Sequence, residues 1–488
     1  MGRAQCLPPA DPGCIGRDVV ARGDTLSVTN WLDDGRGDRL PDPRGFPMRR
    51  RLMLPVALLL LVAGSITPLA AQGADPHAAE CATTLPAADP LPVVAPPLPR
   101  ALPDPMAMMP LDVKIVQMLI GGVLDTIIGG DKRQMIEDLH LGNVILMGRN
   151  VDSPDQVLAL TQGLQGLARS SNGVGLLIAT DQEGGLVQRL NSVSGFTPLP
   201  DAATTGSARC PALLRAYGWM AGEEMAAVGV NMAMAPVLDV NGNPTNPVIG
   251  SLGRSFGTSP EEVELAALPL IAGLHDAGVM ATGKHFPGHG STTADSHKSL
   301  PFVDKERAAL EAVDIAPFRA AIDHGIDTIM PAHVVYSALD PSGMPATVSA
   351  PIQTGLLRGE LGFTGLIVTD DMGMAGITEI YSPGESAVRA VEAGADLITC
   401  VRMTLDSTCP PKMLEQLRHG LMQAVADGRI SRERIDASVR RILVTKSRYH
   451  VGPAPSEGLA TIRGGQHFQA LADLLAMVDI RQEEAGRP

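Results

Sequence analysis

The stretch VMATGKHF, residues 279–286, is an apolar run of strand length that ends near a lysine and a histidine. Seven further runs have this form: QMLIGG at 117–122, NVILM at 143–147, GLLIAT at 175–180, VNMAMAP at 230–236, DTIMPAH at 327–333, GLIVTDD at 365–371 and ADLITC at 395–400. Longer amphipathic segments separate them, for example EEVELAALPLIAGLHDAG at 261–278. Near-continuous apolar strands that alternate with helices predict a parallel sheet buried on both faces.

Polar residues at the strand ends distinguish a closed barrel from an open doubly wound sheet. Asp239 follows its apolar run by a few residues, and the others follow theirs directly: Asp181, Lys284, His285, His333, Asp370 and Asp371. In a (β/α)8 barrel these ends converge on one face, whereas an open sheet would place them along a line. We therefore predict a (β/α)8 TIM-type barrel, a single catalytic domain, over residues 111–447. Residues 448–488 are expected to form a C-terminal tail, too short for a second α/β sandwich domain.

The segment before the barrel has the features of an export signal and a linker. Residues 48–51 are MRRR, and residues 52–71 (LMLPVALLLLVAGSITPLAA) are almost wholly apolar. This pattern predicts a signal peptide at 48–74; the alternative is a retained anchor, because about 20 apolar residues can span a bilayer. Residues 1–47 are expected to be a disordered or non-native extension before a start at Met48, and residues 75–110 a Pro/Ala-rich linker. We expect export to the periplasm or the medium, with residues 52–71 as a membrane tether if the signal is retained.

Four cysteines follow the predicted signal: Cys81, Cys210, Cys400 and Cys409. Export favours disulfides, and Cys400 and Cys409 bracket a short loop (CVRMTLDSTC) that a disulfide could close. The alternative is four free thiols, and the pairing stays open.

The charge balance argues against a polyanionic partner. The net charge is −14 and the pI is near 5.2, whereas a phosphate backbone calls for a basic face. Aromatic residues make up only 3% of the chain, so stacking surfaces are scarce. We expect no nucleic acid partner, and nothing in the sequence indicates an oligomeric state.

Two strand ends carry carboxylates with candidate chemical roles. In GLIVTDDMGM, Asp370 ends its run and should project into the barrel mouth; the alternative is a helix N-cap, which Asp371 could supply instead. In DQEGGLVQR, Asp181 ends its strand, Gly184 and Gly185 allow a tight turn, and Arg189 can fold back over the same face. A carboxylate and a guanidinium suit a hydroxyl-rich substrate, while a structural ion pair is the alternative.

The loop DVNGNPTNPVIGSLGRSFG, residues 239–257, superficially has calcium-loop spacing. It lacks the glycine at the sixth position and the glutamate at the twelfth, so a long ordered loop that carries Arg254 is the better interpretation.

The stretch KHFPGHGSTTADSHKSLP, residues 284–301, allows three interpretations. His285, His289 and His297 suggest a metal site, but Pro287 and Gly288 interrupt any helix between the first two. A phosphate loop would need a stronger glycine pattern. The third interpretation is a general acid/base. An aspartate such as Asp295 can fix the tautomer of His297, and histidine side chains ordinarily gain and lose a proton near neutral pH.

These motifs together resemble glycoside hydrolase family 3, in its single-domain β-N-acetylglucosaminidase branch. The shared motifs are KH-F-PG-H-G-x4-D-S-H at 284–297, DQEGG-x-VQR at 181–189, APV-x-DVN-x-NP-x-NPVIG at 235–250 with GRSFG after it, and TDDM-x-M at 369–374. The resemblance covers residues 111–447. The segment from Thr197 to Gly218, which contains Cys210, does not fit the family pattern.

The resemblance implies a role for each matching residue. Asp370 matches the nucleophile, His297 the acid/base and Asp295 its orienting partner. Sugar-binding positions match the following residues: Asp181, Arg189, Arg254, Lys284 and His285. No cofactor or metal is implied.

The implied activity is that of a retaining exo-glycosidase acting on a small glycan. It would release terminal, non-reducing, β-linked N-acetylglucosamine from peptidoglycan fragments or chitin oligosaccharides, through a covalent intermediate on Asp370. The alternatives are a β-glucosidase or a glycoside phosphorylase of the same fold, a metal-dependent hydrolase that uses the histidine cluster, and a non-catalytic sugar-binding barrel.

Overall fold

The computed structural model describes residues 106, 109–401, 411–454, 459–460 and 466–484. The predicted segments 1–47 and 48–74, nearly all of the linker 75–110, and the cysteines Cys81 and Cys409 lie outside this part of the chain. Among the described helices, none combines the length and the apolar character needed to cross a bilayer.

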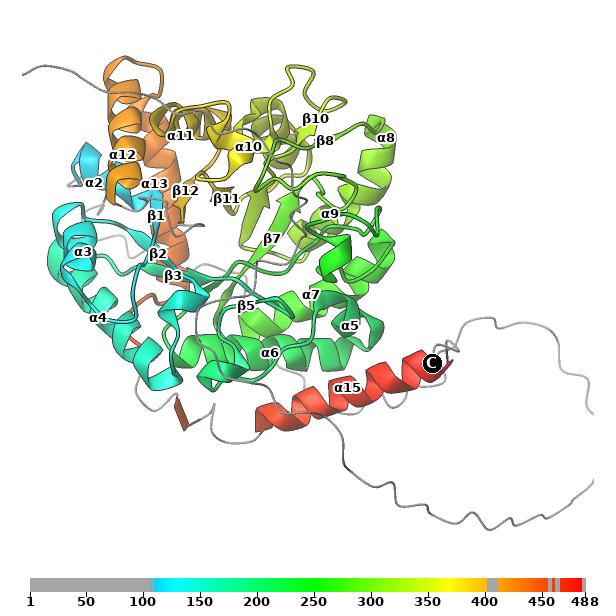
Figure 1. Ribbon diagram of the computed structural model, residues 1–488. Helices are drawn as coiled ribbons and strands as arrows, with labels where there is room; N and C mark the ends of the chain where they lie inside the picture. Colours follow the sequence, from blue (N-terminus) through cyan, green and yellow to red (C-terminus); the bar gives the residue numbers. More distant parts are fainter. Residues whose placement is uncertain (1–105, 107–108, 402–410, 455–458, 461–465, 485–488) are drawn as a thin grey trace, which may run out of the picture. The chain divides into compact units, whose positions relative to one another are not determined.

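Eight parallel strands close into a barrel (Figure 1). They are β1 (Leu119–Gly122), β2 (Asn143–Leu146), β3 (Leu177–Thr180), β6 (Met232–Ala233), β7 (Met280–Phe286), β9 (Thr328–Pro331), β11 (Leu366–Asp371) and β12 (Leu397–Cys400). Their order around the barrel is β1-β12-β11-β9-β7-β6-β3-β2, and β1 closes the ring with Leu119 opposite Ile398 and Ile120 opposite Asn143. Each of the eight predicted apolar runs supplies one strand, which confirms the predicted (β/α)8 fold.

One strand is shorter than its apolar run suggests. The run at 230–236 forms regular ladder pairs only at Met232–Ala233, because Pro236 has no N–H to donate. The chain nevertheless stays beside β7: Thr282 N–H donates to Ala235 O at 2.8 Å, and Leu238 N–H donates to Lys284 O at 2.7 Å.

Helices surround the barrel. They are α2 (Leu111–Gln117), α3 (Gly130–Arg133), α4 (Pro154–Asn172), α5 (Ala202–Ser207), α6 (Pro211–Ala227), α7 (Pro260–Asp276), α8 (Arg307–Ala309), α9 (Ala316–Asp323), α10 (Ala375–Thr378), α11 (Pro383–Ala393), α12 (Pro411–Ala426), α13 (Arg432–Arg448) and α15 (Gln466–Glu484). Two of the longer helices begin on a Ser-Pro pair. Ser153 Oγ accepts from Gln156 N–H at 3.2 Å and Ser259 Oγ accepts from Glu262 N–H at 3.3 Å, and each proline occupies the first helical position.

Short elements complete the loops. The paired strands are β4 (Gln182–Gly184) with β5 (Val187–Gln188), and β8 (Phe302–Val303) with β10 (Val335–Tyr336). The tight and wide helical turns are η1 (Gln134–Asp138), η2 (Gly148–Asn150), η3 (Ser192–Ser194), η4 (Gly250–Leu252), η5 (Leu310–Asp314), η6 (Ala346–Val348) and η7 (Pro351–Glu360).

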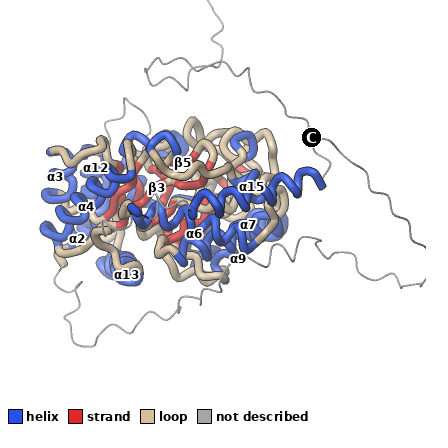
Figure 2. Tube along the Cα trace, turned by 90° about the horizontal axis from the view of Figure 1, so that it is seen from below, coloured by secondary structure: helices blue, strands red, loops and turns tan. Residues whose placement is uncertain are grey.

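The predicted C-terminal tail contains a packed helix. Helix α15 lies along α6 and reaches α5 (Figures 1 and 2). Helix α6 is buried on most of its surface, because α7 covers one side and α15 covers another. This double cover explains why α6 lacks a distinct polar face in the sequence.

Two cysteines of the barrel are disulfide-bonded. Cys210 occupies the N-cap position of α6 and Cys400 ends β12. This bonding excludes the alternative of four free thiols. The pairing of Cys400 with Cys409 stays a prediction, because Cys409 lies outside the described residues.

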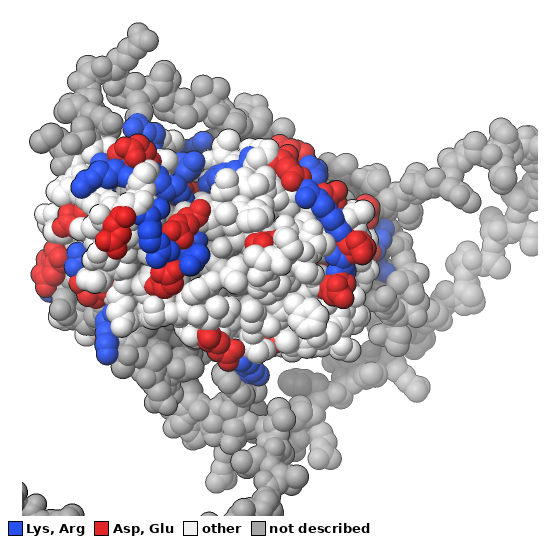
Figure 3. Space-filling model, turned by 90° about the horizontal axis from the view of Figure 1, so that it is seen from above, with Lys and Arg blue, Asp and Glu red and all other residues white. Residues whose placement is uncertain are grey.

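Charged side chains of both signs lie next to one another on the face shown in Figure 3. Surface ion pairs of this kind link α8 to η5 and α11 to the segment after α12. Arg307 contacts Glu311 at 2.7 Å, and Arg429 contacts Glu385 at 2.8 Å. Interspersed charges of this kind do not form a basic field on that face.

Candidate active site

The parallel strands bring the predicted site residues to one face of the barrel. Asp181 directly follows β3, Lys284 and His285 lie near the end of β7, and Asp370 is next to last in β11. Because all barrel strands point the same way, these C-terminal ends share a face.

A buried network of charges joins β3 to β7. Lys284 Nζ lies 3.0 Å from Asp181 Oδ1 and 2.6 Å from Glu183 Oε1. Arg189 Nη2 lies 3.2 Å from Asp181 Oδ2. Arg254 donates two hydrogen bonds, of 2.7 and 2.8 Å, to the Glu183 carboxylate. The Lys284 side chain is only 3% exposed. Three cations against two carboxylates leave a net charge of +1.

Glu183 is the member of this network that sequence reasoning missed. Arg254 reaches the network through Glu183, which also contacts Lys284, so Glu183 joins Arg254 to the other predicted sugar-binding residues. The sequence feature that could have identified Glu183 is its position in the DQEGG motif, two residues after Asp181. Glu183 points back into the barrel mouth because strand β4 alternates its side chains.

The network holds its carboxylates ionised. Burial raises the pKa of Asp181, but Lys284 and Arg189 outweigh burial and place that pKa well below its usual range. Burial likewise opposes ionisation of Glu183, yet Arg254 and Lys284 lower its pKa to about 2. Acceptors that stay ionised can receive hydrogen bonds from sugar hydroxyls at any physiological pH.

Two glycines shape the hairpin that carries this network. Gly184 and Gly185 have φ angles of 93° and 54°, which side chains rarely adopt. A Cβ on Gly184 would lie 2.0 Å from Pro200 O. The predicted tight turn is therefore present, and it packs directly on the segment before α5.

Asp239 orients the end of β7. Its buried carboxylate lies 2.7 Å from His285 Nδ1 and accepts from the backbone N–H groups of His285 and His289 at 3.1 and 2.7 Å. Burial opposes ionisation of Asp239, but His285 outweighs it, so the pKa is lowered. His285 therefore presents its other ring nitrogen away from Asp239.

The imidazole rings of the three histidines in the 284–301 stretch have separate hydrogen-bond partners. His285 contacts Asp239, His297 contacts Asp295, and the buried His289 lies 2.9 Å from Thr292 Oγ1 and 3.1 Å from Ser296 Oγ. Burial lowers the pKa of His289 to about 4, which keeps it neutral. Among the described residues, no three His, Cys, Asp or Glu side chains are grouped to hold a metal, so this geometry does not support the metal-dependent alternative.

Asp370 lies among imidazoles and is half-buried. Burial opposes its ionisation, but His333, His285 and His297 outweigh it and lower the pKa of Asp370. One carboxylate oxygen accepts from Asp371 N–H at 2.7 Å. Asp370 is not a helix N-cap, because α10 begins four residues beyond Asp371 with Met374 at the cap position.

Asp371 has a structural role that differs from the predicted cap. Its Oδ1 accepts from Gly373 N–H at 3.0 Å and from Val401 N–H at 2.8 Å, so it joins the turn after β11 to the end of β12. Its Oδ2 is buried and has no partner among the described residues. Burial, with a contribution from Asp370, raises the pKa of Asp371 to about 7.

The Asp295–His297 pair lies on a loop at the edge of the site. His297 Nδ1 is 2.8 Å from Asp295 Oδ1, and the same oxygen accepts from His297 N–H at 2.9 Å. The His297 side chain is 40% exposed. Between the two, the buried Ser296 receives a backbone hydrogen bond of 3.1 Å from Gly376, which follows the Asp370 strand. The loop is therefore fastened next to Asp370 while the imidazole stays accessible.

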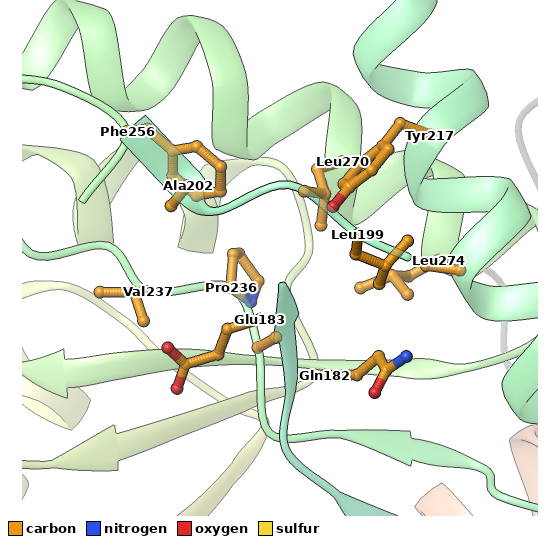
Figure 4. Close-up of a pocket in the computed structure, with 12 residues that line it drawn as sticks. Gln182, Glu183, Leu199, Ala202, Tyr217, Pro236, Val237, Phe256, Leu270 and Leu274 are labelled. Carbon is orange, nitrogen blue, oxygen red and sulfur yellow. The ribbon is translucent and has the colours of Figure 1, made fainter. Parts of the chain in front are cut away.

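A small cavity lies behind the hairpin (Figure 4). Gln182 and Glu183 point to opposite sides below it, and Tyr217 and Phe256 lie above it. Its volume of about 20 Å³ holds about one water molecule, so it is not a sugar site. A second pocket of about 250 Å³, between α5 and the start of α7, contains none of the predicted site residues.

Comparisons with known proteins identify the family of this chain. Residues 110–445 match the glycosyl hydrolase family 3 N terminal domain. The chain is 42% identical over 291 residues to a β-hexosaminidase of Alkalilimnicola ehrlichii, covering 58% of this chain and 80% of that protein.

Two solved structures are similar as well. One is a glycoside hydrolase family 3 β-N-acetylglucosaminidase from Paenibacillus sp. str. FPU-7, at 40% identity and a TM-score of 0.67, covering 73% of this chain and 68% of that one. The other is a β-N-acetylhexosaminidase from Beutenbergia cavernae, at 33% identity and a TM-score of 0.64, covering 70% of this chain and 99% of that one. The family expected from the motifs is thereby confirmed: the chain belongs to glycoside hydrolase family 3 and is a glycoside hydrolase.

Proposed function

We propose that this enzyme releases terminal, non-reducing, β-linked N-acetylglucosamine from small glycans with retention of configuration. The observation that carries the proposal is the placement of an ionised, half-buried Asp370 beside an accessible His297–Asp295 pair. The similar structures named as a β-N-acetylglucosaminidase and a β-N-acetylhexosaminidase support the choice of sugar.

In the first step, a carboxylate oxygen of Asp370 attacks the anomeric carbon. The bond from that carbon to the leaving oxygen breaks, and protonated His297 donates its proton to the departing oxygen. Asp295, on the other ring nitrogen, stabilises the imidazolium and fixes which nitrogen faces the substrate.

In the second step, neutral His297 takes a proton from water as the water oxygen attacks the same carbon. The ester bond to Asp370 breaks and its carboxylate is restored. We place the terminal sugar against the residues that match the family's sugar-binding positions: Asp181, Arg189, Arg254, Lys284 and His285. Arg254 also contacts Glu183. Peptidoglycan fragments are the natural source we favour, with chitin oligosaccharides second, and we propose that the enzyme acts after export.

Asp370→Ala should abolish turnover of an aryl N-acetyl-β-glucosaminide, because the covalent step loses its nucleophile. A mechanism-based fluorosugar should label Asp370 in the wild-type enzyme, as read by peptide mass spectrometry. Label on another residue contradicts the assignment. The matched control is Asp371→Asn, which alters the neighbouring carboxyl and should keep the label on Asp370.

The same assay tests which sugar the enzyme prefers and whether water or phosphate accepts that sugar in the second step. An aryl N-acetyl-β-glucosaminide should turn over faster than the matching aryl β-glucoside, and the reverse order supports the β-glucosidase alternative. Added inorganic phosphate should leave free N-acetylglucosamine as the product, whereas a sugar 1-phosphate supports the phosphorylase alternative.

A further inference from the structure

Helix α15 lies beyond residues 110–445, the part of the chain that matches the family. It packs on α6 and α5 (Figures 1 and 2). Its buried positions His467, Leu471, Leu474 and Val478 follow a helical spacing that forms one face, while Leu475 is exposed. The helix therefore has a defined inner face, and this face includes a histidine.

His467 is fully buried against two glutamates of α6. Its Nδ1 lies 3.2 Å from Glu224 Oε1, its Nε2 lies 3.5 Å from Glu223 Oε2, and the Trp219 ring meets it edge-on with centroids 6.0 Å apart. Burial opposes protonation of His467, but Glu224 and Glu223 outweigh it and raise its pKa. Among the described residues, His467 is the titratable base that contacts Glu224.

Glu224 in turn holds the segment that supports the sugar-binding hairpin. Its buried carboxylate accepts from Thr197 N–H at 3.1 Å and from Thr197 Oγ1 at 2.6 Å. Thr197 O accepts from Gln188 Nε2 at 2.7 Å, and Leu199 N–H donates to Gln188 Oε1 at 2.9 Å. Gln188 belongs to β5 and directly precedes Arg189.

A continuous chain of contacts thus runs from α15 to the proposed sugar site. It passes from His467 to Glu224, from Glu224 to Thr197, and from Thr197 through Gln188 to the hairpin that pairs Arg189 with Asp181. Removal of His467 would leave the buried Glu224 carboxylate without this hydrogen-bond partner, which is costly. We expect the Glu224 side chain in such a variant to turn toward water, and its hydrogen bonds with Thr197 to break.

We propose that Glu224 and His467 are positioning residues for sugar binding, and that α15 keeps the Asp181–Arg189 hairpin in its binding geometry. The proposal rests on the proposed function, in which Asp181 and Arg189 bind the terminal sugar. It places part of the binding apparatus outside the family domain, in the predicted tail.

The test uses the full 488-residue chain with three substitutions. His467→Leu and Glu224→Gln should each raise KM for an aryl N-acetyl-β-glucosaminide by about tenfold and leave kcat within about twofold, the pattern of lost ground-state binding. Inhibition by free N-acetylglucosamine should weaken in parallel. Glu223→Gln is the matched control, because Glu223 contacts the same histidine but not Thr197, and it should leave KM unchanged.

Two outcomes would contradict the proposals, and the variants distinguish them. A lowered Tm with unchanged KM in both His467→Leu and Glu224→Gln shows that α15 only stabilises the barrel, and overturns the proposal. If Asp181→Asn also leaves KM unchanged, the proposed sugar site itself fails.

If His467→Leu does not fold, the double variant His467→Leu/Glu224→Gln removes the uncompensated charge and should fold with a raised KM. Hydrogen exchange of residues 182–190 provides an independent measurement: it should be faster in Glu224→Gln than in Glu223→Gln, and equal rates overturn the proposal.

Discussion

The two halves of the proposed site are built in opposite ways. The binding half, centred on Lys284 and Glu183, is dry, and its charges are paired across strand ends that are far apart in the sequence. The proton-transfer half, Asp295 and His297, comes from one short loop and is accessible to solvent. A buried ion pair fixes the geometry of its two side chains, but loss of one partner leaves an unpaired buried charge, which is strongly destabilising. An exposed pair can gain or lose a charge with little change in stability. Binding a sugar needs the first property and moving a proton needs the second.

The largest combined loss of stability and activity should follow from breaking the buried half at Glu183. Glu183→Gln leaves Lys284 and Arg254 without their shared carboxylate, so we expect a loss of about 3 kcal/mol in the free energy of unfolding. The kcat/KM should fall by roughly 100-fold as the sugar-binding cations move. Urea unfolding and steady-state kinetics measure the two losses.

Glu262→Gln is the control for Glu183→Gln. It breaks a different Arg–Glu pair, with Arg209, at an exposed position. It should cost no more than about 1 kcal/mol. Equal losses in the two variants would contradict the distinction between the buried and the exposed ion pairs.

The next effect concerns the accessible half. Asp295→Asn removes the charge that supports the His297 imidazolium, so turnover of a β-linked disaccharide of N-acetylglucosamine should fall by about 10²-fold. A dinitrophenyl glycoside, whose leaving group needs no proton, should react at nearly the wild-type rate in the first step. An equal loss on both substrates would show that Asp295 has a role in binding or folding instead.

A third prediction concerns pH and the buried carboxyl of Asp371, next to Asp370. The pKa of Asp371 is about 7 in the folded protein, against an ordinary value of 3.8, so the folded state keeps a proton that the unfolded chain loses first. The free energy of unfolding should therefore fall as pH rises from about 4 to 7, by about 4 kcal/mol from this group. Asp371→Asn should remove that fall, as the difference between wild-type and variant stability across the pH range will show. A constant difference from pH 4 to 7 would contradict a raised pKa.

The smallest effect should come from Lys298, which lies 3.7 Å from Asp295 and is exposed. Lys298→Ala should change stability by less than about 0.5 kcal/mol and leave kcat/KM near the wild-type value, because solvent screens this pair. A large loss would indicate that the acid/base loop depends on charges beyond the His297–Asp295 pair.

Local pattern was sufficient for the architecture. Each strand could be recognised because buried parallel strands are apolar throughout, and the residues after them had to converge once the strands were parallel. Asp181, Lys284 and Asp370 could be located from that rule alone. The motif resemblance then suggested roles for His297 and Asp295, which lie on a loop where periodicity says nothing.

Side-chain contacts between distant parts of the barrel could not be predicted from local sequence patterns. The sequence by itself determined the (β/α)8 fold, the face that carries the site and the identity of most of its side chains. The apolar runs, and the polar residues that follow them, can be read from short segments of the chain. Only the tertiary structure decided that Glu183 joins Lys284 to Arg254, that Asp239 orients His285, and that α15 packs on α6 with His467 against Glu224. These contacts join residues dozens to hundreds of positions apart, and barrel closure and loop paths set them.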